Sequence, residues 1–311
     1  MTSSTTLSTE PKKSQRTPWS RLRAWARTEG LFSHVVMIVV LFIIFIPLIW
    51  LVSTTFKNRI EFSTNSAGLI PRSFSLVNYE YMLTAVENLP IYMRNSFILA
   101  IGTTVLQVFV CSLAGYAFAR MNFRFRDLIF FLLIASLFIP RTGGLMAIYE
   151  LMVFLKLRNS LIGLILLFAS GIIVPTFIMR QTFTSVPKEL EEAALIDGAN
   201  WFQVFWKIAL PLAAGGVVVI STLSFIGVWS DYLTTYTLVD KDDQMTISVG
   251  INKILASSYE TALTVPRFRG QFAGEAADAT ALLFAAIPVV IFYAVLQKWF
   301  MKGLTEGALK F

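Results

Sequence analysis

The sequence predicts an all-α membrane protein with six transmembrane helices. Of its 311 residues, 56% are hydrophobic and 14% are charged, a composition too apolar for a water-soluble domain. Apolar runs recur along the chain, and about 20 such residues suffice to cross a bilayer as a helix. We expect transmembrane spans at about residues 31–56, 95–118, 128–139, 161–179, 212–229 and 281–300.

The composition also excludes several kinds of site. A single cysteine and a single histidine rule out a disulfide framework and make a metal centre implausible. The net charge is +7, but the basic residues do not form one run, so no nucleic-acid partner is expected. The chain has no glycine-rich loop ending in Lys-Ser or Lys-Thr, the phosphate-binding loop of many ATPases. We therefore expect no cofactor, and any ATP must be bound by another polypeptide.

The N-terminal 30 residues are rich in Ser and Thr and then basic, which predicts a flexible cytosolic tail. A signal peptide is the alternative, but the apolar run that follows is long and lacks a small-residue cleavage pattern. His34 lies near the cytosolic end of the first span, where a lone histidine is more often an interfacial residue than a proton relay. Residues 57–92 are expected outside the membrane, and residues 93–300 form a core of five helices.

Two features between the later spans follow from local patterns. Apolar residues from Leu145 to Leu155 repeat at helical spacing, which predicts a short amphipathic helix at the outer surface. Pro175 lies inside the fourth span, where a proline is tolerated if a neighbouring helix satisfies the carbonyl that it frees. Residues 233–280, between the fifth and sixth spans, are expected to form a largely polar segment.

Residues 185–211 have a pattern unlike that of the spans on either side. Pro187 suits the start of a helix, and good helix formers follow it. Gly198 predicts a turn that a residue with a Cβ would strain. Asn200 and Gln203 have the spacing of a capping box, so a second helix is expected. The stretch is thus predicted to form a helix, a glycine turn and another helix.

This stretch resembles the EAA loop of ABC-importer permeases. In that family the loop forms a coupling helix that docks in a groove of a cytosolic ATPase subunit. The glutamate of the motif offers a charge to a basic partner. The alternative is an amphipathic loop that lies on its own membrane face. The positions of this chain that match the family pattern are Glu192, Ala193, Ala194, Asp197, Gly198, Ala199, Ile208, Leu210 and Pro211.

Residues 297–308 resemble the C-terminus of the second permease of carbohydrate importers, the MalG type. Residues 229–232 resemble the Trp-Asn-x-Phe stretch of the same group, although Ser230 replaces the Asn and Tyr232 the Phe. In relatives the C-terminal tail, here residues 301–311, reaches the ATPase interface; a disordered end is the alternative. The tail residues that the resemblance singles out are Gly303, Leu304, Thr305 and Gly307.

The resemblance implies the type I ABC-importer permease fold. It implies a MalF-like second permease, two ATP-binding ATPase subunits and an extracytoplasmic solute-binding protein as partners. The chain itself would be no enzyme; it would move a di- or oligosaccharide across the cytoplasmic membrane by alternating access. Residues near the outer mouth of the fifth span are candidates for the sugar path, with an interfacial aromatic belt as the alternative. These candidates are Trp229, Asp231, Tyr232 and Tyr236.

The charge distribution predicts the orientation. Six spans place both ends on one side, and the short basic turn Arg120–Arg126 marks that side as cytoplasmic. Residues 185–211 then face the cytoplasm, where an ATPase would be. Two alternatives remain. An importer of glycerol phosphate or a polyol would be favoured if a basic residue such as Arg141 faced the cavity. An ion-coupled secondary transporter would need intramembrane carboxylates, which the centres of the six spans almost lack.

Overall fold

The computed structural model of the chain describes residues 30–139, 144–271 and 273–308. Within these ranges, the side chains of residues 30–31, 257–259, 261–264 and 299–308 are left undescribed. Every regular element of the described residues is a helix, which confirms the all-α prediction. Arg141 and residues 1–29 of the predicted tail lie outside the described residues.

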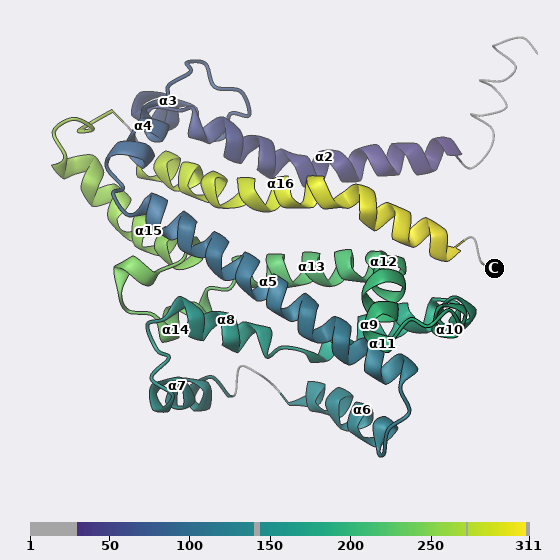
Figure 1. The fold of residues 1–311 in the computed structure, drawn as a ribbon. Helices are drawn as coiled ribbons and strands as arrows, with labels where there is room; N and C mark the ends of the chain where they lie inside the picture. The colour runs from purple at the N-terminus through teal and green to yellow at the C-terminus, as the bar shows by residue number, and fades with distance from the viewer. Residues whose placement is uncertain (1–29, 140–143, 272, 309–311) are drawn as a thin grey trace, which may run out of the picture.

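Three helices in the described residues are long and apolar enough to cross a bilayer, judged by length and composition. They are α2 (Gly30–Thr55), α5 (Leu89–Arg120) and α16 (Gly274–Ala308), which match the first, second and sixth predicted spans. Residues 301–308 continue α16 rather than forming a separate tail. α2 lies beside α16 (Figure 1). Its side chains at residues 32–49 are all exposed, so this apolar surface requires lipid or an apolar partner.

Two further pairs of helices are long and apolar enough to cross a bilayer only when the two helices of each pair are counted together as one bent span. α8 (Leu161–Ala169) and α9 (Ile173–Ser185) are bent by 50°, and the helical stretch 201–212 meets α13 (Ala214–Trp229) at 75°. The described residues therefore contain three to five candidate spans. The predicted third span coincides with two short elements that do not qualify, so the count of six remains a prediction. These elements are α6 (Arg126–Ala135) and η1 (Ser136–Phe138).

The bend between α8 and α9 leaves a backbone carbonyl that another helix satisfies. The carbonyl of Gly171, in the break, accepts a hydrogen bond from the side-chain amide of Gln107 on α5 at 2.8 Å. Pro175 is the third residue of α9, a position whose N–H has no partner within a helix. The proline therefore frees no carbonyl of α9, and its place in the first turn is what makes it tolerated.

α5 is the central helix, since it packs against α8, α9 and α13. Small residues allow this close approach: a Cβ on Gly115 would lie 2.6 Å from the Cβ of Met179 on α9. Two clusters of buried apolar side chains lie along α5. One includes Leu99 in its first half and the other includes Cys111 in its second half. The two halves of the bundle are therefore held by separate cores on one continuous helix.

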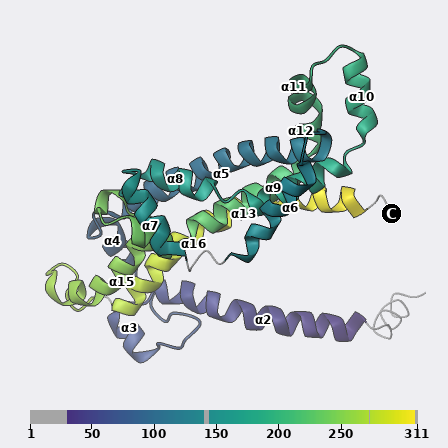
Figure 2. The same cartoon turned by 90° about the horizontal axis from the view of Figure 1, so that it is seen from below.

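The two ends of the bundle carry different elements. The start of α2, the end of α16 and helix α10 (Lys188–Ile196) lie toward one end (Figures 1 and 2), which we call the α10 end. Helices α3 and α15 lie toward the other end, the α15 end. The helix predicted at residues 145–155 is present as α7, but its exposed side is also apolar, since Met146 is 67% exposed and Phe154 81%. The remaining elements are α3 (Arg59–Thr64), α4 (Val77–Thr84), α7 (Leu145–Phe154), α11 (Trp201–Val204), η3 (Phe205–Ala209), α12 (Leu210–Leu212), α14 (Leu233–Leu238), η4 (Asp242–Gln244) and α15 (Ile247–Thr264).

The segment between α2 and α5 folds around two buried charges. Lys57 is fully buried, and its ammonium donates to three backbone carbonyls between Asn65 and Gly68 at 2.7–3.1 Å. Glu61 accepts a hydrogen bond from the backbone N–H of Arg72 at 2.9 Å, and this bond holds the pKa of the Glu61 carboxyl below its usual value. The segment predicted to lie outside the membrane is therefore an ordered cap on the α15 end.

Candidate functional site

The predicted helix, glycine turn and helix are present at the α10 end. Gly198 has φ = +88°, the left-handed conformation that favours glycine after a helix. The N–H of Gly198 donates to the carbonyl of Leu195 at 3.1 Å, and that of Ala199 to the carbonyl of Ala194 at 3.0 Å. These two bonds form a Schellman motif. They satisfy carbonyls at the end of α10 and fix where the chain turns.

The second helix of the loop begins with the predicted capping box. The backbone N–H of Gln203 donates to the side chain of Asn200 at 2.9 Å, and the N–H of Asn200 donates to the side chain of Gln203 at 3.0 Å. α11 then widens into the π-helix η3 before α12, which contains Pro211. The span α13 starts only at Ala214, beyond the 75° bend. The fifth span was expected to begin at about residue 212, and Pro211 lies in α12, before the bend.

The tip of this loop exposes apolar side chains. Ile196 is 86% exposed, Phe202 68% and Trp201 52%. Apolar residues clustered at one tip are typical of a contact surface. The family-matched residues divide by position. Ala194, Ala199, Ile208 and Leu210 are half-buried, whereas Glu192, Ala193, Asp197, Gly198 and Pro211 are exposed.

One carboxylate of α10 is buried, and the sequence did not single it out. Glu191 accepts a hydrogen bond from the Nε of Arg120 on α5 at 2.8 Å, and the two side chains are 5% and 4% exposed. The hydroxyl of Tyr116 donates to the other Glu191 oxygen at 2.9 Å. Arg120 also donates to the backbone carbonyl of Val186, after α9, at 2.6 Å. The base of α10 is thereby fastened to both α5 and α9.

The family motif marks Glu192, the neighbour of the buried Glu191. Glu192 matches the EAA pattern but is exposed, whereas Glu191 beside it faces α5. Nothing local distinguishes the two, because the partner Arg120 lies 71 residues away in the sequence. A signal was present at the other end of the pair: Arg120 is the last residue of a long apolar run and sits at a helix end.

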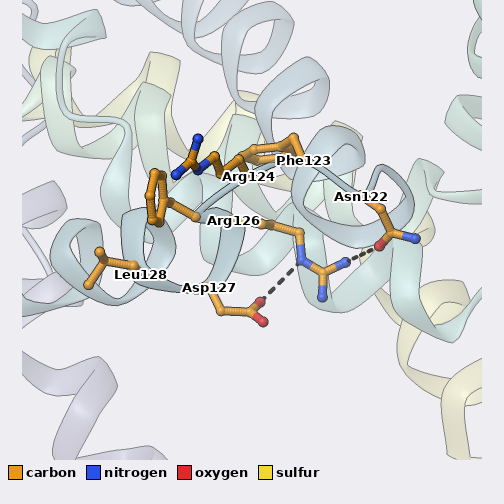
Figure 3. A pocket seen from close by; sticks show the side chains of 7 residues that line it. Asn122, Phe123, Arg124, Arg126, Asp127 and Leu128 are labelled. Atoms are coloured by element: carbon orange, nitrogen blue, oxygen red, sulfur yellow. Dashed lines mark hydrogen bonds and ion pairs between the residues drawn. The ribbon is translucent and has the colours of Figure 1, made fainter.

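The turn between α5 and α6 lies next to this buried ion pair and is itself basic. It lines an open pocket of about 470 Å³, drawn in Figure 3. The guanidinium of Arg126 donates to Asn122 and Asp127, each at 3.1 Å. Phe125 has φ = 63°, which turns the chain sharply into α6. The predicted basic turn therefore lies at the α10 end.

At the α15 end, the four candidates for the sugar path separate into two pairs. Trp229 is buried, and its indole N–H donates to the carbonyl of Ala285 on α16 at 3.0 Å. Asp231 caps α14, since its side chain accepts from the backbone N–H of Thr235 at 3.0 Å. Tyr232 and Tyr236 instead line an open cleft of about 640 Å³. Trp229 and Asp231 support this region, and the two tyrosines face its cleft.

The tail residues lie on the last helix. Gly303, Leu304, Thr305 and Gly307 belong to α16, which ends at Ala308 at the α10 end. Their side chains are among those left undescribed. The backbone places this segment toward the same end of the bundle as the loop tip.

Comparison with known proteins decides the family. The family described as "Binding-protein-dependent transport system inner membrane component" matches residues 107–306, a range that includes α10 and its loop. The chain belongs to this family. It is therefore an inner-membrane component of a transport system, and its family consists of permease subunits that are not themselves catalytic.

Two curated relatives and one solved structure are similar to this chain. The chain is 31% identical to the sulfoquinovosyl glycerol transport permease SmoH of Agrobacterium fabrum, over 85% of this chain and 88% of the relative. It is 30% identical to the maltodextrin transport permease MdxG of Bacillus subtilis, over 86% and 91% respectively. A chain of a bacterial ABC transporter that imports the acidic polysaccharide alginate matches with a TM-score of 0.78 at 21% identity, covering 92% of this chain and 99% of that one. The ABC-importer permease fold is thus confirmed.

Proposed function

We propose that this chain is the permease subunit of an ATP-driven importer that moves a di- or oligosaccharide across the cytoplasmic membrane. The coupling of transport to ATP hydrolysis is supported by the loop of α10 and α11. This loop exposes an apolar tip, and a buried ion pair holds its base to the bundle. The sugar part is supported by relatives at about 30% identity that carry maltodextrin and galacto-oligosaccharides.

The geometry suggests how force from an ATPase would reach the membrane. A subunit that moves the exposed tip would move α10. The Arg120–Glu191 pair would transmit that motion to α5 and α9. Because α5 also packs on α8 and α13, the bundle would shift as a body between two states. This is the rigid-body form of alternating access.

The partners follow from the same proposal. Two ATP-binding subunits would bind the exposed apolar tips of this chain and of a MalF-like second permease. The end of α16, with Gly303 to Gly307, lies toward the same end and would contact the ATPase pair. A solute-binding protein would dock at the α15 end, and a related alginate transporter has been solved with its periplasmic protein. The N- and C-termini would then lie in the cytoplasm.

Photo-crosslinking from the assembled complex tests this arrangement. A photoreactive residue at Ile196, which is 86% exposed, is expected to crosslink to a subunit with a phosphate-binding loop, identified by mass spectrometry. One at Thr305 should reach the same subunit. Phe42 on α2, exposed on a helix expected to face lipid, is the control and should give no such product. A crosslink from Ile196 only to lipid would support the loop that lies on its own membrane face and would reject the ATPase contact.

A further inference from the structure

The cleft at the α15 end combines aromatic and polar side chains. It has a volume of about 640 Å³, within the usual range of small-molecule sites. It lies between α14, η4 and α15, at the opposite end of the bundle from α10. Its lining residues are Tyr232, Tyr236, Asp240, Asp242, Met245, Val249, Asn252 and Lys253.

Two tyrosines form one wall of the cleft. Tyr232 lies directly before α14 and Tyr236 lies within it, four residues later. At this spacing the two side chains lie on the same side of the helix. Their rings stack with centroids 5.3 Å apart at an angle of 21°. Tyr236 is 57% exposed, so its ring offers a free surface. Each tyrosine combines an apolar ring with a polar hydroxyl, which suits a ligand that has apolar C–H faces and hydroxyl groups.

The charged groups of the rim are paired. The ammonium of Lys253 lies 2.5 Å from both carboxylate oxygens of Asp242. Asp240 forms an ion pair with Arg158, which lies before α8. The two carboxylates of the cleft are thus balanced by two cations, and none of the lining residues that the structure describes is a cation without a carboxylate partner. Such a rim can hydrogen-bond a neutral polar ligand, whereas it offers an anion little attraction.

The cleft is held in shape from several sides. The side chain of Asp231 accepts a hydrogen bond from the backbone N–H of Thr235 in α14. The backbone carbonyl of Asp231 accepts another from the hydroxyl of Ser248 on α15, at 2.6 Å. The side-chain amide of Asn95 on α5 donates to the carbonyls of Asp243 and Met245, each at 2.9 Å. These bonds come from three different helices, so the lining is positioned before any ligand arrives. Preorganisation of this kind lowers the cost of binding.

We propose that this cleft is a saccharide subsite of the permease, which receives a neutral sugar unit and discriminates against acidic ones. One sugar face would lie on the ring of Tyr236, and sugar hydroxyls would bond to Asn252 and to the Asp242–Lys253 pair. This inference rests on the proposed function. It also goes further, since relatives and fold neighbours include carriers of acidic and sulfonated sugars, whereas this rim favours a neutral one.

Saturation-transfer NMR on the assembled complex in nanodiscs, held outward-facing with ATP and vanadate, tests the subsite. Maltotriose is the neutral probe and trigalacturonate the acidic one. We expect saturation of maltotriose and at least ten-fold less of trigalacturonate. Tyr236→Ala should remove at least nine-tenths of the maltotriose signal, and Tyr236→Phe should keep most of it. Tyr293→Ala removes an exposed tyrosine of α16 and is the matched control, expected to change nothing.

A second variant keeps the test decisive if Tyr236→Ala assembles poorly. Asp242→Asn removes one carboxylate from the rim, so the preference for maltotriose over trigalacturonate should fall several-fold. Equal saturation by both sugars in the unmodified complex, or an unchanged signal in Tyr236→Ala, would overturn the subsite. So would a Tyr236→Ala variant that loses only stimulation by the binding protein, since the cleft would then be a protein contact. Crosslinking from Ile196 is independent of these outcomes, so the subsite can fail while the proposed function stands.

Discussion

Replacing Glu191 with glutamine is expected to lower sugar transport per ATP hydrolysed at least ten-fold. The substitution leaves the guanidinium of Arg120 buried without its counter-charge. Breaking one side of a buried ion pair costs about 3–5 kcal/mol, so α10 would no longer be held firmly to α5. ATP hydrolysis by the assembled complex should continue, because this chain binds no nucleotide in our account. Parallel measurement of uptake and phosphate release in proteoliposomes gives the ratio.

The helix offers a matched control for this change. Glu189 lies on the same helix and is exposed, so Glu189→Gln should leave the ratio unchanged. The double variant Arg120→Gln with Glu191→Gln removes both charges and is expected to be more stable than either single variant. Transport per ATP that stays normal in Glu191→Gln would show that the buried pair only supports the fold and does not link α10 to the bundle.

Gly198→Pro is expected to reduce uptake to background while the complex still assembles. Gly198 has φ = +88°, whereas proline is fixed near −65° and has no N–H. The substitution would therefore break the bond from Gly198 to Leu195 and redirect α11 with its apolar tip. Gly198→Ala keeps the N–H but costs about 1–2 kcal/mol in the left-handed conformation, so an intermediate loss is expected. Uptake and co-purification of the ATPase subunit are the measurements.

A glycine outside the loop provides the comparison. A Cβ at Gly227, inside α13, would meet nothing within 4 Å, and its φ is not in the left-handed region. Gly227→Ala should therefore transport normally. Uptake by Gly198→Pro at the rate of the unmodified complex would mean that the direction of the turn is unimportant, and the coupling role of the loop would be rejected.

Features set by a few neighbouring residues were predictable from the sequence. The first span was expected at residues 31–56 and is Gly30–Thr55, because a long apolar run specifies a helix by itself. The Asn200–Gln203 capping box and the turn at Gly198 were also correct, since each depends on residues at most five positions apart. Local chemistry alone determines these elements.

Features set by contacts between distant segments were not predictable in the same way. Glu191 looks like an exposed helix residue until α5 places Arg120 beside it. The burial of Trp229 also depends on a distant segment, because α16 supplies the carbonyl that binds its indole; its place on the sugar path stays a prediction. The fourth span was expected to be one helix, yet it bends by 50° at a break where Gln107 on α5 binds the carbonyl of Gly171. In each case the deciding partner lies more than 50 residues away.

ATP-driven uptake in proteoliposomes tests the central claim most directly. The purified complex is reconstituted with ATP inside the vesicles, and its binding protein, loaded with radiolabelled maltotriose, is added outside. We predict accumulation of sugar that requires both ATP and the binding protein and that persists when ion gradients are collapsed. Accumulation driven by a proton or sodium gradient without ATP would contradict the account and identify the chain as part of a secondary transporter.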